Sequence, residues 1–301
     1  MDVLWDPFVQ SAFMQRALVA GIVIAIATAV VGTITVLRGM AFLGDALAHG
    51  VLPGIAAALL IGIPSVIGAL AGAAVMMGGV AAISRRTRLS SDVAIGLLFV
   101  GMLALGVVII SRSSDFAGSL TDILFGEVLG VTWTQIAWQA GVAVVVVALA
   151  WLLRRPMLLM AMDPDQARVA GYRVGLIEAV LLGMIAITVV ASFVVVGALL
   201  VFGMLLAPAG AAALVTRRLG SMMVVAAAIG IVSTYVGLLL SWHFDLAAGA
   251  SVVLTAVVIF FVVAIAQALV PSRRPHPEPL QPLFVIFPET IDPARMRTAE
   301  I

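Results

Sequence analysis

The chain has 301 residues, of which 63% are hydrophobic and 10% charged, and its mean hydropathy is +1.25. This composition excludes a soluble globular domain and indicates a polytopic, all-α membrane protein. The formal net charge of +1 gives no reason to expect a nucleic-acid partner. Cysteine is absent, which excludes disulfides and thiolate metal sites, and all 16 basic residues are arginine, so this chain has no Walker A phosphate loop, which needs a lysine.

Nine apolar runs of roughly membrane-spanning length follow one another, since a helix needs about 20 apolar residues to cross a bilayer. The first is expected to be a permanent span, because the residues before Arg16 include two aspartates and lack the basic start of a signal peptide. Residues 174–215 are almost continuously apolar, and a re-entrant run there would leave eight spans. The runs are 13–37, 40–62, 65–83, 92–110, 134–153, 174–192, 194–215, 222–241 and 247–270.

The arginines predict how the spans are oriented. They follow the odd-numbered runs, at Arg38; Arg85, Arg86 and Arg88; Arg154, Arg155, Arg168 and Arg173; Arg217 and Arg218; and Arg273 and Arg274. The even-numbered connections have only Arg112, together with Asp115, Asp122 and Glu127, which either form an acidic vestibule that concentrates cations or are ordinary loop charges. The positive-inside rule then places the N-terminus outside and the C-terminus in the cytoplasm. Residues 1–270 are expected to form one transmembrane domain, and the proline-rich residues 271–301 an irregular cytoplasmic tail.

Small residues recur at the spacing of helix-packing motifs. GVLPG spans Gly50 to Gly54, and GALAG spans Gly68 to Gly72. Glycines four residues apart let two helix backbones approach closely within lipid. The alternative is chance, because the chain has 28 glycines.

An aspartate and a histidine lie one helical turn apart in the otherwise apolar stretch FLGDALAHGVLPG, at Asp45 and His49. On a helix that starts near Met40 they would lie about 8 and 14 Å from its start, within the hydrocarbon core. An aspartate there costs roughly 2.5–3.5 kcal/mol on insertion scales. Pro53 cannot donate a backbone hydrogen bond to the His49 carbonyl, so the helix is expected to bend or open after His49.

Carboxylate and imidazole are ligands suited to zinc, manganese or ferrous iron. The pair therefore predicts a metal-transport site, although a local Asp–His hydrogen bond with no other role is the structural alternative. Two ligands are too few for a tight metal site. A two-fold homodimer would bring two pairs together and supply four ligands around its axis.

This region resembles the ABC-3 family of metal-ion ABC transporter permeases. The resemblance begins with RGMAFLGDALAHGVLPGIAAALLIG (Arg38 to Gly62) and extends, in the family's order, over most of the chain from Phe13 to about Val270. The further similar blocks are SSDVAIGLLFVGMLALGVVIIS (Ser90 to Ser111), ILFGEVLGVT (Ile123 to Thr132), MDPDQARVAGYRV (Met162 to Val174), VVGALLVFGMLLAPAGAAALVTRRLG (Val195 to Gly220) and GLLLSWHFDLAAGASVVL (Gly237 to Leu254).

The resemblance implies a homodimeric permease in the prokaryotic cell membrane that works with two cytoplasmic ATPase subunits and an extracytoplasmic metal-binding protein. Asp45 and His49 match the family's D-x-x-x-H positions, which implies a role in metal passage. Zinc is the first expected cargo, with manganese or iron as alternatives, and ATP is expected on the partner chain. The resemblance also implies that the segment Ala209 to Ser221, expected to leave the membrane at Pro208, docks into the ATPase. Met162 to Arg173, with a helix start at Asp163-Pro164 and a stop at Gly171, is the second candidate contact.

Four other acidic or histidine positions have roles outside this pair. Glu178 could face a cavity or reach the cytoplasmic interface. His243 and Asp245 could form a site where the ion first binds, but a solvated loop is the simpler interpretation. Asp92 follows two serines at an expected helix start, where helix capping explains it.

Two other function classes remain to be compared with ATP-driven uptake. A secondary carrier could use Asp45 and His49 to pass protons, and it would need no ATPase. An intramembrane metalloenzyme would need a third ligand and an acid or base nearby, and the sequence has no HExxH-like set.

Overall fold

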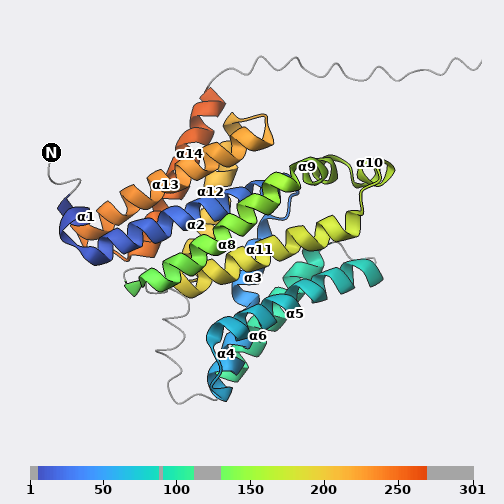
Figure 1. Ribbon diagram of the computed structural model, residues 1–301, viewed down its shortest axis with the longest axis horizontal. Coiled ribbons are helices and arrows are strands. Elements are labelled where there is room, and N and C mark those ends of the chain that lie inside the picture. The colour runs from blue at the N-terminus through green and yellow to red at the C-terminus, as the bar shows by residue number, and fades with distance from the viewer. Residues whose placement is uncertain (1–5, 88–90, 112–129, 270–301) are drawn as a thin grey trace, which may run out of the picture. The chain divides into compact units, whose positions relative to one another are not determined.

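The computed structural model describes residues 6–87, 91–111 and 130–269, and within these residues the secondary structure is helical (Figure 1). The first compact unit is Met1–Gln267. The second, Ala268–Ile301, contains the expected tail, which lies outside the described residues. In chain order the helices are α1 (Asp6–Gln10), α2 (Ala12–Leu37), α3 (Ala41–Gly50), α4 (Leu52–Ile61), α5 (Ser65–Arg86), α6 (Ser91–Ile110), α8 (Trp133–Leu152), α9 (Arg154–Met162), α10 (Pro164–Val169), α11 (Val174–Val196), α12 (Ala198–Val215), α13 (Leu219–Phe244) and α14 (Ala248–Leu269).

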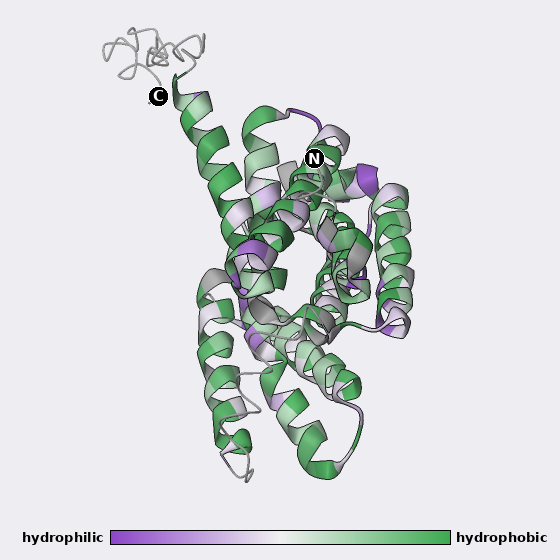
Figure 2. Cartoon of the chain, turned by 90° about the vertical axis from the view of Figure 1, so that its left-hand side faces the viewer, coloured by the Kyte–Doolittle hydropathy of each residue, from purple (hydrophilic) through white to green (hydrophobic). Residues whose placement is uncertain are grey.

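The predicted all-α membrane fold is confirmed. Within the described residues, eight segments are long and apolar enough to cross a membrane, with α3 and α4 together forming one of them. Apolar residues predominate along the helices (Figure 2). The continuous stretch 174–215 divides at Gly197, whose φ of 81° ends α11, and α12 is the shorter apolar helix that the alternative count of eight leaves out.

The most enclosed of the eight segments is α2, which packs against α8, α12 and α13. Its contacts are close because its glycines are small. A Cβ at Gly32 would overlap the Leu205 carbonyl oxygen of α12, and one at Gly21 would overlap the Thr234 side chain of α13. The three helices around α2 thus fix its position, and with it the start of α3, which follows after a short turn.

A second group of neighbours consists of α4, α5 and α6. A Cβ at Gly54 would overlap the Gly68 carbonyl oxygen, and one at Gly68 would overlap that of Gly54. A Cβ at Gly72 would lie 3.0 Å from the Gly50 oxygen. The predicted close approach is therefore confirmed, and the two small-residue motifs pack against each other.

The connections near the arginine clusters differ in part from expectation. The segment expected to leave the membrane at Pro208 is still helical there, because α12 continues through Pro208 to Val215, where the expected run 194–215 also ends, and Ala209, Ala211 and Ala212 are buried. The short helix expected after Met162 is confirmed as α10. Asp163 accepts hydrogen bonds from the backbone N–H groups of Asp165 (2.8 Å) and Gln166 (3.3 Å), and Gly171 follows the helix with a φ of 83°.

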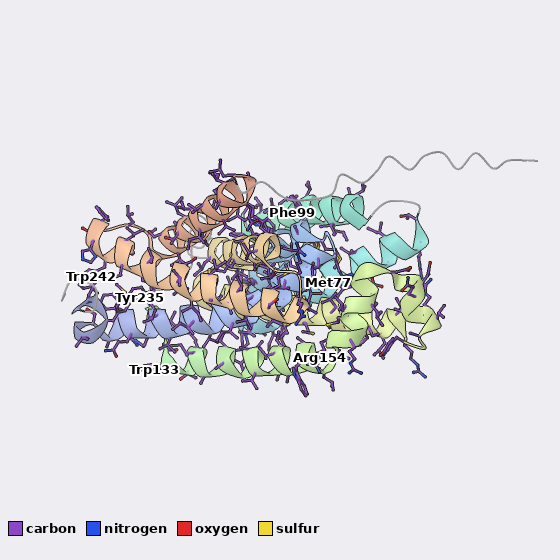
Figure 3. All side chains as sticks on the ribbon, turned by 90° about the horizontal axis from the view of Figure 1, so that it is seen from above. Met77, Phe99, Trp133, Arg154, Tyr235 and Trp242 are labelled. Carbon is purple, nitrogen blue, oxygen red and sulfur yellow. The ribbon has the colours of Figure 1, made fainter. Side chains whose placement is uncertain are left out.

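Aromatic side chains lie at the opposite end of the bundle from Arg154, as Figure 3 shows for Trp133 and Trp242. The Trp242 ring of α13 lies 5.9 Å from that of Phe13 at the start of α2. At the other end, the Arg154 guanidinium lies 5.2 Å from the centre of the Trp151 ring. Tryptophan near both helix ends is typical of the two membrane–water interfaces.

A candidate metal site on α3

The helix that has Asp45 and His49 is short because the chain is interrupted after them. α3 ends at Gly50 and α4 begins at Leu52, with Val51 between them and Pro53 in the first turn of α4. This confirms the predicted opening after His49. The candidate site is therefore at the end of a half-length helix, beside a joint in the span.

One face of α3 is open, and both candidate ligands are on it. Leu43, Gly44, Ala46, Leu47, Ala48 and Gly50 are buried, whereas Phe42 is exposed and Asp45 and His49 are partly exposed. Spacings of three and four residues place Phe42, Asp45 and His49 in a single stripe. The neighbours α6, α11 and α12 cover the rest of the helix. The most polar part of α3 is thus the part that this chain leaves incompletely covered.

The two ligands are close but do not hydrogen-bond well to each other. His49 Nε2 lies 3.6 Å from Asp45 Oδ1, beyond the usual hydrogen-bond distance, and the side chains are 23% and 24% exposed. Bonds from zinc to nitrogen or carboxylate oxygen are about 2.0–2.2 Å long, so two atoms at this separation can contact one ion. The separation is therefore compatible with a shared cation as well as with a local Asp–His ion pair.

The second ring nitrogen of His49 is buried, and among the described residues it has no hydrogen-bond partner. The imidazole is held instead by the Phe99 ring of α6, which lies edge-on at 5.4 Å between centroids. Phe99 also meets Phe42, at 6.1 Å. In many metal sites a polar residue binds the second ring nitrogen and so orients the histidine. Here the contact with the Phe99 ring orients the imidazole instead.

Glu178 lies beside Arg38, which neither sequence interpretation anticipated. Arg38 follows α2, Glu178 is in the second turn of α11, and their charged groups are 3.8 Å apart. Arg38 is 14% exposed and Glu178 39%, and Nη1 of Arg38 has no partner in the described part of the chain. A pairing between residues so far apart in sequence has no local signal that could have revealed it.

The remaining sequence candidates do not join this site. Within the described residues, no group of three or more His, Asp or Glu side chains could hold a metal ion. His243 and Asp245 are exposed at the end of α13, where His243 Nδ1 is 2.9 Å from the Leu239 oxygen and Asp245 ends the helix with a φ of 52°. Asp115, Asp122 and Glu127 lie outside the described residues. Among the described residues, Asp45 and His49 are thus the two candidate ligands that the fold brings together.

Comparison with known proteins places the chain in a family. The model of the ABC 3 transport family matches residues 10–267. The chain belongs to this family. A probable iron transport system membrane protein of Haemophilus influenzae is 38% identical over 272 residues, which cover 90% of this chain and 99% of that protein. The manganese transport system membrane protein MntC of Listeria monocytogenes is 36% identical over 260 residues, covering 85% and 91%.

A solved structure supports the same family assignment. PsaBC from Streptococcus pneumoniae in complex with Fab has a chain that is 32% identical, with a TM-score of 0.77 over 86% of this chain and 93% of that one. The ABC-3 resemblance stated above is thereby confirmed, and the chain is a multi-pass protein of the cell membrane.

Proposed function

We propose that this family member is the permease subunit of an ATP-binding-cassette importer for a divalent transition metal. The observation on which this rests is the open stripe of α3, where a carboxylate and an imidazole lie 3.6 Å apart in an apolar helix. The relatives named for iron and manganese transport support these two metals before zinc, which the sequence analysis had placed first.

In the proposed mechanism, Asp45 supplies the negative charge that offsets the loss of water from a dication, and His49 supplies a neutral nitrogen ligand. A two-fold homodimer that buries the open stripe would place two such pairs around one axis. Two carboxylates and two imidazoles would bind the ion firmly enough to select it. Because the ligands lie beside the Val51 joint, a small movement of α3 would separate the pairs and release the ion.

Energy for transport would come from partner chains, since this chain lacks the lysine of a phosphate loop. We place the ATPase contacts at the exposed end of α12 and the following turn, Leu214 to Ser221, and at Asp163 to Arg173, rather than at the buried alanines after Pro208. This assignment needs those turns, and the C-terminus, in the cytoplasm. An extracytoplasmic binding protein would deliver the ion to the opposite end of the bundle.

The test is uptake by the permease and its ATPase, reconstituted together in liposomes. We expect manganese or iron to enter only with ATP, and His49→Ala and Asp45→Asn each to lower the initial rate at least about 100-fold while ATPase binding persists. The control is Val232→Ala, an exposed position on α13 outside the proposed metal and ATPase contacts, which should transport normally. Uptake by the permease alone along a proton gradient would instead support the secondary carrier. Full activity of Asp45→Asn would refute the site.

A further inference from the structure

An apolar groove runs along the membrane face formed by α8 and α13 over α2. One hollow of about 580 Å³ includes Val147 and Trp151 of α8 and Met223 and Val224 of α13. A second, of about 560 Å³, continues along α2 and α8 and shares Ile26, Val147 and Trp151 with the first. The two hollows therefore adjoin each other on the surface, and their lining is almost entirely apolar.

The length of this groove suits one lipid chain. Its lining on α8 runs from Ala140 to Trp151, roughly 17 Å at 1.5 Å per residue. One leaflet of the hydrocarbon core is about 15 Å thick, half of about 30 Å. An acyl chain can thus lie in the groove while its headgroup reaches the Arg154 end.

Two arginines stand at that end. Arg154 and Arg155 both line the first hollow, and in the described part of the chain neither forms an ion pair. They also occupy the first turn of α9, which has no acidic residue there. Because a helix N-terminus is itself positive, this end of the groove has an excess of positive charge that an anion would offset. The Trp151 ring, 5.2 Å from the Arg154 guanidinium, is of the kind that anchors a helix end at a membrane–water interface.

We propose that this groove binds an anionic glycerophospholipid, with an acyl chain between α8 and α13 and its phosphate on Arg154 and Arg155. The charges select an anionic headgroup over a zwitterionic one, and the apolar hollows distinguish a lipid from free phosphate. The inference is independent of the transported metal. It adds a lipid-binding site on the face of the bundle formed by the helices that surround α2.

The test is native mass spectrometry of delipidated permease titrated with phosphatidylglycerol, phosphatidylcholine or inorganic phosphate. We expect phosphatidylglycerol to bind at least tenfold more tightly than phosphatidylcholine, and phosphate not to compete at matched concentrations. Arg154→Gln with Arg155→Gln should weaken phosphatidylglycerol binding by roughly tenfold to thirtyfold, at about 1 kcal/mol for each charge. The double lysine variant should retain most of the binding, and Arg16→Gln, at the far end of α2, should retain all of it.

Two matched variants on α13 test the apolar part of the site. Val224→Trp fills the groove and should weaken binding, whereas Val232→Trp, also exposed but outside the lining, should not. Equal affinity for the two lipids, displacement by phosphate, or normal binding by the double glutamine variant would overturn the proposal. So would a cross-link between copies through Val224→Cys in the native membrane, because a second copy of the chain would then occupy the groove.

Discussion

Asp45 and His49 are accessible because the residues around them are small. Gly44 and Gly50 let α3 press against its neighbours, since a Cβ at Gly44 would overlap the Leu205 side chain and one at Gly50 would lie 3.0 Å from Met76 Cγ. Close packing on those sides leaves the ligand stripe as the remaining face. The same arrangement keeps a carboxylate in an apolar helix without a hydrogen-bonding partner that fully satisfies it.

That carboxylate should lower the stability of the metal-free chain. We expect Asp45→Asn to raise the free energy of unfolding by about 1–2 kcal/mol, because a neutral amide is easier to keep in a membrane helix than a charge. Chemical denaturation of both proteins in detergent, without added metal, measures this difference in the free energy of unfolding. Asp245→Asn is the control, since asparagine tolerates the left-handed backbone of an exposed helix end. A loss of stability at position 45 would mean that the carboxylate has a structural partner.

Arg38 and Glu178 form the other charged pair of functional interest, because they join the end of α2 to the start of α11. Glu178→Gln should lower the free energy of unfolding by about 1–2 kcal/mol. This lies between the typical cost of breaking an exposed ion pair and that of breaking a buried one. The exchange Arg38→Glu with Glu178→Arg should recover at least half of this loss, which a double-mutant cycle would measure. No recovery would show that each side chain is held by other contacts.

At the scale of helices, the contact between α4 and α5 depends on having no side chain at Gly54 and Gly68. Gly68→Ala should lower the free energy of unfolding by about 1–3 kcal/mol, because its Cβ meets a carbonyl that cannot move aside. Gly78→Ala on the same helix has open space and should be neutral or slightly stabilising. Thermal unfolding compares the stabilities of the two variants. Equal loss of stability in both would contradict the close backbone contact at Gly68.

The sequence predicts the helices better than their ends. Length and apolarity locate the spans, and the four-residue spacing of Asp45 and His49 predicts their shared face. The run expected over 194–215 ends where α12 ends, at Val215, and Pro208 lies inside this helix, which packs against α2. The Arg38–Glu178 pair needs contacts between distant segments, which no local pattern contains. α9 was missed because its two arginines indicated a loop after the fifth span.

At the scale of the whole molecule, the orientation in the membrane is testable because the chain has no cysteine. We expect Thr134→Cys, at the start of α8, to react with a membrane-impermeant maleimide added to intact spheroplasts. Ser221→Cys, in the first turn of α13, should react only after permeabilisation. Both positions are exposed, so accessibility within the fold is matched. The reverse pattern would overturn the proposed topology and the ATPase contacts that depend on it.

The proposed homodimer gives a second whole-molecule prediction. If the open stripe of α3 lies on the two-fold axis, Phe42→Cys should form a disulfide between copies under mild oxidation in membranes. Leu254→Cys on α14 is exposed to a similar extent and should remain monomeric. Cross-linking at α14 alone would place the axis elsewhere and leave the metal ligands unpaired.

The burial of α2 also has a consequence for biosynthesis. This helix is synthesised before three of its neighbours, α8, α12 and α13, which begin more than a hundred residues after its own start, so it enters the lipid without them. The buried threonines of α2 need no partner from another helix. The hydroxyls of Thr28, Thr33 and Thr35 donate to carbonyls of α2 itself, at 2.7, 2.6 and 2.9 Å. A nascent chain can therefore insert α2 alone, with these three polar groups already satisfied, and assemble the bundle around it afterwards.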